Sequence, residues 1–140
     1  MYLILANIVW ILYALFEGYR ESYYWFFKTN SNVINNYEMH PLFELQRGIV
    51  LLLIFVNLLL LTNPIVASLN IISNALLFSY FHNGIYYLTR NKLDNNVYKL
   101  KWKDDSTTST AKTERFFKYK YRTAYVIIGG IITILSIIIK

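Results

Sequence analysis

One apolar stretch, residues 65–87, constrains this chain more than any other feature. Read as an α-helix at about 1.5 Å per residue, it reaches about 33 Å, which matches the roughly 30 Å hydrocarbon core of a bilayer. It nevertheless carries Asn70 and Asn74 inside and ends near His82 and Asn83. The stretch therefore predicts a transmembrane helix whose polar side chains face other helices rather than lipid.

Three more apolar segments accompany it, so we predict an all-α membrane protein, a four-transmembrane-helix bundle formed by residues 1–140 as one integral membrane domain. The composition agrees, because 56% of the residues are hydrophobic, against about 45–50% in soluble domains. A three-span protein, with the charged first segment lying peripherally, is the alternative. The expected spans are 2–27, 42–61, 65–88 and 116–139.

Local signals mark the connections between these segments. Pro41 suits the first turn of a helix, and Asn63-Pro64 predicts a tight turn that makes the second and third segments an antiparallel hairpin. The long connection 89–115 is polar and basic. Within it, apolar side chains alternate with lysines from 97 to 103, which predicts a short β-like ribbon. The last helix is expected to begin near residue 111.

The chain contains no cysteine, which excludes disulfides, thiolate metal sites and cysteine nucleophiles. The Walker A, Gly-x-Ser-x-Gly and His-Glu-x-x-His patterns are also absent. Function must therefore be argued from the placement of charge and not from a catalytic motif.

The distribution of charge predicts an orientation. The formal net charge is +6, and most of the cations lie in residues 89–122, which include the start of the fourth segment. By the positive-inside rule this connection is cytoplasmic, and both termini lie on the non-cytoplasmic side of a plasma, inner or organellar membrane. The cations concerned are Arg90, Lys92, Lys99, Lys101, Lys103, Lys112, Arg115, Lys118, Lys120 and Arg122.

Several ionisable side chains are expected at one depth near the cytoplasmic leaflet. Counted at about 1.5 Å per residue, Glu17 and Arg20 reach about the height of His82, and Arg47 reaches it from the other direction. Such a layer is either a network of ion pairs that fixes helix register or a functional pocket. The polar-layer candidates are Glu17, Arg20, Glu21, Glu44, Arg47, His82, Asn83 and Arg90.

The pocket hypothesis has two forms. In the first, carboxylate and imidazole ligands hold a divalent metal as cofactor. In the second, arginines hold an anionic head group or phosphate while a carboxylate or imidazole handles protons. The metal candidates are Glu17, Glu21, His40 and His82. The arginine candidates are Arg20, Arg47 and Arg90.

A second group of residues is predicted to lie at the lipid surface. Its basic charge is attracted to anionic lipids at the cytoplasmic face by roughly 1 kcal/mol per residue, and its aromatic rings suit the membrane interface. Docking to a protein partner or to nucleic acid is the less favoured reading. The residues are Lys99, Lys101, Trp102, Lys103, Lys118, Lys120 and Arg122.

Three functions remain open from the sequence. The first is a non-catalytic subunit or effector in a membrane assembly, with the lipid bilayer and other membrane proteins as partners. The second is a membrane-embedded enzyme that binds a metal or a lipid head group through Glu17, Glu21 and His82. The third is a small transporter, which we expect least because the outer half of the bundle lacks ionisable groups.

Overall fold

Four long helices make up most of the protein. The computed structural model describes residues 2–30, 40–96, 98–105 and 118–139. All four helices are long and apolar enough to cross a membrane, and the all-α prediction is confirmed for the described residues. The helices are α1 (Tyr2–Asn30), α2 (His40–Leu61), α3 (Pro64–Leu93) and α4 (Tyr119–Ile139).

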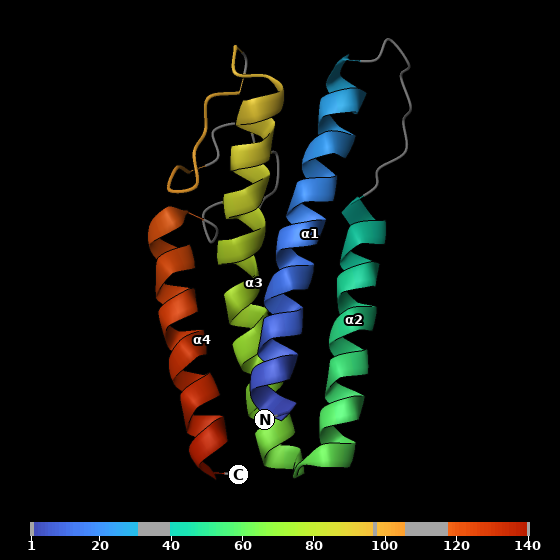
Figure 1. Ribbon diagram of the computed structural model, residues 1–140, viewed down its shortest axis with the longest axis vertical. Helices are drawn as coiled ribbons and strands as arrows, with labels where there is room; N and C mark the ends of the chain where they lie inside the picture. The colour runs from blue at the N-terminus through green and yellow to red at the C-terminus, as the bar shows by residue number, and fades with distance from the viewer. Residues whose placement is uncertain (1, 31–39, 97, 106–117, 140) are drawn as a thin grey trace.

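The helices differ in length, and the difference shapes one end of the molecule. At about 1.5 Å per residue, α2 and α4 reach about 33 and 31 Å, whereas α1 and α3 reach about 43 and 45 Å. Figure 1 shows α1 and α3 rising beyond the other two at the end opposite the chain termini. We call this end, where α1 and α3 finish and α2 and α4 begin, the basic end.

The hairpin between α2 and α3 forms as predicted from Asn63-Pro64. Asn63 caps α3, because its side-chain Oδ1 accepts a hydrogen bond of 2.9 Å from the backbone N–H of Val66. Pro64 occupies the first turn of α3, where a missing N–H costs nothing. Pro41 likewise lies in the first turn of α2.

The third helix is longer than predicted. Residues 89–93, assigned to the connection from the sequence, continue α3 as far as Leu93. Arg90 and Lys92 lie in its last turn, where positive charge interacts favourably with the helix dipole. The predicted start of the last helix near residue 111 lies outside the described residues, and Lys118 precedes α4 without being helical.

The predicted β-like ribbon is not formed by its described residues. Residues 98–105, which we call the strap, contain no strand and instead turn near Trp102. The backbone N–H of Lys101 donates to the Asp104 carboxylate at 2.7 Å, which closes this turn. Tyr98 is buried, whereas Lys99 and Lys101 are exposed.

The strap fills the space beside α3 that the shorter α4 does not reach (Figure 1). Trp102 lies directly over Gly84, where a Cβ atom would overlap the indole ring. Asp105 accepts a hydrogen bond from the backbone N–H of Tyr119 and so satisfies a donor in the first turn of α4. The strap therefore joins the basic ends of α3 and α4.

Packing is uneven among the helices. α3 packs against α1 on one side and α4 on the other, whereas α2 makes far fewer contacts with the rest of the chain. At the end near the termini, Leu3, Leu58, Val66 and Ala67 form a small apolar core. In a bilayer the exposed side chains of α2 would face lipid or another protein.

Candidate functional site

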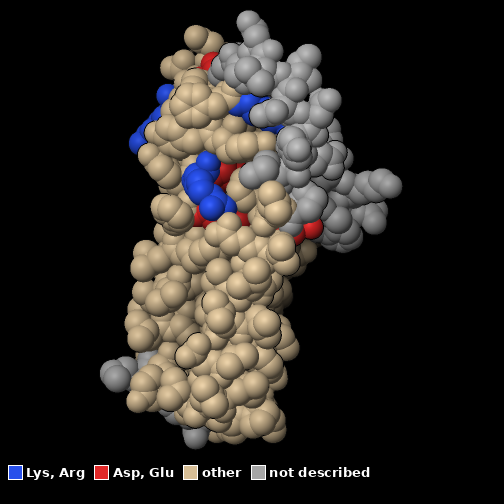
Figure 2. Space-filling model, turned by 90° about the vertical axis from the view of Figure 1, so that its right-hand side faces the viewer, with Lys and Arg blue, Asp and Glu red and all other residues tan. Residues whose placement is uncertain are grey.

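The charged side chains gather at the basic end. Figure 2 shows Lys, Arg, Asp and Glu only on the upper part of the visible face, above a long surface without charge among the described residues. The charge pattern of the sequence thus becomes a charged layer at one end of the bundle.

Four of the eight polar-layer candidates meet in one cluster, which we call the ionic cluster. Arg47 on α2 donates from Nε to Glu17 Oε1 at 2.8 Å and from Nη2 to Glu21 Oε2 at 3.1 Å. His82 Nε2 on α3 lies 2.9 Å from the same Glu21 oxygen. Glu17, Glu21 and His82 are buried, whereas the Arg47 side chain is 26% exposed. The cluster therefore links three helices.

A glycine allows this convergence. A Cβ atom at Gly18 would overlap the backbone carbonyl of His82, so α1 and α3 touch backbone to backbone at this level. Glu17 and Glu21 are four residues apart and share a helix face. The close approach therefore presents both carboxylates to the imidazole on α3.

The surroundings of His82 bear on the charge of the cluster. Its Nδ1 lies 2.9 Å from Asn83 Oδ1, and its Nε2 faces the Glu21 carboxylate. Arg47 Nη2 also lies 3.3 Å from the same Nε2, so this nitrogen faces both a carboxylate and a guanidinium. The net charge of the cluster depends on the number of protons on the imidazole: a neutral ring leaves one net negative charge, whereas an imidazolium together with Arg47 balances the two carboxylates.

The same residues include a possible set of metal ligands. Ligand atoms of Glu17, Glu21 and His82 lie within 4.8 Å of one another and all three residues are buried. Glu17 Oε2 has no hydrogen-bond partner. Carboxylate and imidazole ligands suit Zn²⁺ and related divalent ions. The side chain of His40, the fourth metal candidate, lies outside the described part of the chain.

The other polar-layer candidates lie outside the ionic cluster. Arg20 donates to Gln46 on α2 at 2.8 Å. Glu44 is exposed, because its position on α2 faces away from the other helices. Asn83 contacts the cluster only through His82. Arg90 is buried against the rings of Phe26 and Tyr98 and is not part of any described ion pair.

Most of the predicted lipid-surface residues are exposed, but the prediction is wrong for Arg122. It is fully buried, and its Nη2 donates to the backbone carbonyls of Trp102 and Asp104 at 3.2 and 2.8 Å. Because the strap covers the start of α4, this side chain holds the strap and does not reach a lipid surface. Trp102 is half-buried over α3. The exposed members are Lys99, Lys101, Lys103, Lys118 and Lys120.

Arg90 and Arg122 share an aromatic environment. The Arg90 guanidinium lies 5.3 Å from the centre of the Tyr98 ring, and that of Arg122 lies 5.2 Å from the Tyr87 ring. These two rings are 6.3 Å apart. Burial raises the pKa of the Tyr98 phenol, so its hydroxyl stays neutral and supplies no counter-charge. Cation–π contacts therefore replace ion pairs here.

Sequence reasoning missed three contributors to the polar layer. Phe78 stacks on His82 with ring centres 4.8 Å apart and also lies 4.9 Å from the Arg47 guanidinium. Trp25 donates to Glu21 at 3.2 Å. Gln46 accepts from Arg20. The i, i+4 spacing of Phe78 with His82 and of Glu21 with Trp25 was a usable signal, whereas nothing in the sequence singled out Gln46.

The chain matches no protein-family model, no curated protein and no solved structure. Function must therefore be argued from the geometry of the chain itself.

Proposed function

We propose that this protein is a non-catalytic subunit or effector of a membrane assembly, inserted with the basic end cytoplasmic and both termini on the other side. The observation that carries the proposal is the exposure of α2. The ionic cluster ties this helix to α1 and α3 through Arg47, yet most of the surface of α2 stays uncovered. The positive-inside rule supports the orientation.

The uncovered face of α2 contains a polar side chain. Leu53, Asn57 and Leu60 share one face and are all exposed, Leu60 to 80%. Asn57 Nδ2 donates to the Leu53 carbonyl at 2.7 Å within the helix, which leaves its second N–H and its own oxygen for another partner. In lipid these groups have no partner, whereas a neighbouring transmembrane helix can supply one. This favours an assembly over an isolated bundle.

The ionic cluster supports a structural role rather than catalysis. Both carboxylates are already bonded to Arg47. A reaction at this site would first have to displace Arg47. A network of ion pairs that links three helices suits a role in fixing their register.

Single cysteines test the assembly directly, because the natural chain has none. We expect Leu60→Cys, carrying a thiol-attached photo-crosslinker in native membranes, to give an adduct heavier than the monomer. Adding Asn57→Leu should reduce that adduct. Ile138→Cys on α4, exposed to 74%, is the matched control and should give little. A monomer alone at both positions would reject the proposal.

The orientation has its own test. Lys101→Cys on the strap should react with a membrane-impermeant maleimide only when the cytoplasmic side is accessible. Asn63→Cys in the α2–α3 turn should show the opposite pattern, and reversed labelling would contradict the proposed orientation.

A second candidate function is divalent-metal binding by Glu17, Glu21 and His82, favoured by their mutual distances and by the unpartnered Glu17 oxygen. Arg47 competes with a cation for both carboxylates. Elemental analysis of purified protein should then show a stoichiometric metal that Glu17→Gln/Glu21→Gln removes and Arg47→Met retains or increases. Protein without metal in all three forms would exclude this function.

The transporter hypothesis gains no support from the described residues. Ser73, Thr133 and Asn7, from three helices, bond to one another, with 2.7 Å between the hydroxyls of Ser73 and Thr133 and 3.2 Å from the Thr133 hydroxyl to Asn7 Oδ1. Such contacts suit helix packing.

A further inference from the structure

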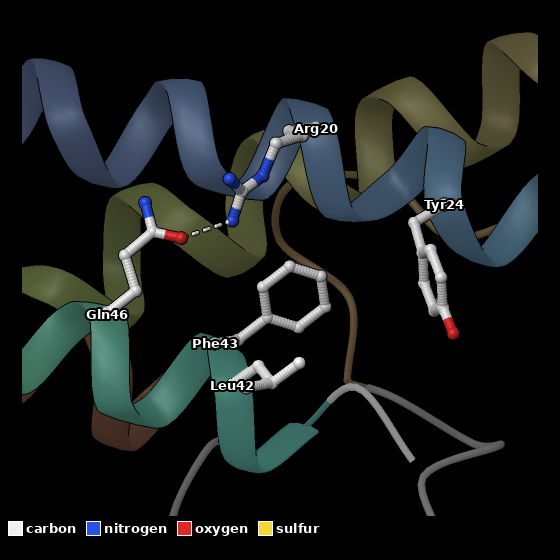
Figure 3. A pocket seen from close by; sticks show the side chains of 5 residues that line it. All are labelled: Arg20, Tyr24, Leu42, Phe43 and Gln46. Atoms are coloured by element: carbon white, nitrogen blue, oxygen red, sulfur yellow. Dashed lines mark hydrogen bonds between the residues drawn. The ribbon is translucent and has the colours of Figure 1, made fainter. Parts of the chain in front are cut away.

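A pocket of about 240 Å³ opens between α1 and α2 at the basic end. Figure 3 shows Arg20 reaching across from α1 toward Gln46, with a phenyl ring and a leucine side chain on the α2 side. The lining is therefore apolar around a single cation. The residues that line it are Arg20, Tyr24, Leu42, Phe43 and Gln46.

Arg20 forms no ion pair with any carboxylate among the described residues. Its Nη2 donates to Gln46, a neutral group, and its guanidinium lies 5.0 Å from the centre of the Phe43 ring. Its Nε is buried without a hydrogen-bond partner. Arg47, one residue beyond Gln46, has two carboxylates, whereas no described carboxylate forms an ion pair with Arg20. The pocket therefore carries one net positive charge.

The depth of the pocket makes this charge significant. Gln46 lies six residues into α2, about 9 Å from its start. If α2 spans the bilayer, this level is near the boundary between head groups and hydrocarbon. An unpaired guanidinium there is costly, and lipid phosphates are the anions closest to it.

We propose that this pocket binds a phosphate group, with the Arg20 guanidinium as its anchor. Arginine presents a planar fork of donors that matches phosphate oxygens. Gln46 and Tyr24, which line the same pocket, carry further hydrogen-bond donors. Leu42 and Phe43 would contact an adjoining acyl chain when the phosphate belongs to a lipid. This site goes beyond the proposed assembly function and does not depend on it.

The competing explanation is purely structural. Arg20, Gln46 and Phe43 would then only tie α1 to α2, and no ligand would be needed. The two explanations differ in whether a bound phosphate depends on Arg20.

The experiment measures retained ligand by native mass spectrometry after exchange into phosphatidylglycerol or phosphatidylcholine nanodiscs, with a parallel calorimetric titration of inorganic phosphate. We expect Arg20→Gln to lower phosphatidylglycerol retention by about tenfold or more, the effect of losing a charge-assisted hydrogen bond. Lys101→Gln, which removes an exposed cation from the strap, is the matched control and should change retention by less than about twofold.

A second variant guards against loss of folding. Leu42→Trp fills the pocket and leaves Arg20 in place, so it should lower lipid retention while the unfolding temperature stays near that of the natural protein. Binding of both inorganic phosphate and lipid would identify the phosphate group itself as the ligand, and binding of lipid alone would identify a phospholipid. Unchanged retention in Arg20→Gln, an equal loss in Lys101→Gln, or no binding of either ligand would overturn the proposal.

Discussion

Arg47 and Arg122 lie at the same end of the bundle, yet they are satisfied by different acceptors. Arg47 bonds to two buried carboxylates on α1. Arg122 bonds to two backbone carbonyls of the strap and stacks near tyrosine rings. Removing Arg47 leaves buried negative charge behind, whereas removing Arg122 leaves only neutral acceptors. The partner, and not the arginine, therefore sets the cost of a substitution.

The largest expected effect follows from Arg47→Met. Glu17 and Glu21 would be left as buried charges without their cation, which should lower the free energy of unfolding by about 3–5 kcal/mol. The triple variant Glu17→Gln/Glu21→Gln/Arg47→Met should recover most of this loss, because the two carboxylates and the arginine that pairs with them are removed together. Unfolding of the detergent-solubilised protein measures both, and a triple variant as unstable as Arg47→Met would contradict the interpretation.

Arg122→Met should cost less, about 1–3 kcal/mol, because only carbonyl groups lose their donor. The loss should be local. Hydrogen exchange would show faster exchange in the strap, near Tyr98 and Asp104, while the middle of α3 stays protected. If the strap exchanged as slowly as in the natural protein, Arg122 would not be what holds it.

Gly84→Ala tests the contact between the strap and α3. The added methyl group would overlap the Trp102 ring, so the ring must move at a cost of roughly 1–2 kcal/mol or less. The measurement uses a background in which the other two tryptophans are replaced by phenylalanine, so that only Trp102 fluoresces. In this background, Gly84→Ala should increase the quenching of Trp102 fluorescence by acrylamide. The replacement background with Gly84 retained is the control, and equal quenching in both would place Trp102 elsewhere.

Glu44→Gln should have the smallest effect. Glu44 is exposed on α2, so its neutralisation should change the free energy of unfolding by no more than about 0.5 kcal/mol. Glu17→Gln is the informative comparison, because the same chemical change removes a buried acceptor of Arg47. Equal effects of the two substitutions would show that burial does not distinguish them.

The fold was predictable because transmembrane length and apolarity are local properties of the chain. Asn63-Pro64 also predicted the α2–α3 turn from its own capping and backbone preferences. The end of α3 was less predictable, since residues 89–93 are mostly polar and Arg90 is buried through contacts with Phe26 on α1 and Tyr98 in the strap, which are distant in the sequence. The alternation at 97–103 predicted a short β-like ribbon that the described residues do not form, because a strand also requires a pairing partner.

The candidate site was predictable in depth but not in pairing. Helical rise alone placed Glu17, His82 and Arg47 at similar heights. Rotation of each helix about its axis then separated Glu44, which faces away, from Arg47, which faces inward. The sequence of a single helix with apolar residues all round does not show how that helix is rotated about its axis.

By itself, then, the sequence determined four long apolar helices, one strongly basic connection and a layer of ionisable groups, because length, hydropathy and charge are summed along the chain. Only the tertiary structure decided that Arg47 pairs with Glu17 and Glu21, that Arg20 forms no ion pair with a described carboxylate and that Arg122 holds the strap. Those outcomes depend on helix rotation and on close approaches such as that at Gly18, where atoms distant in the chain come within hydrogen-bond distance.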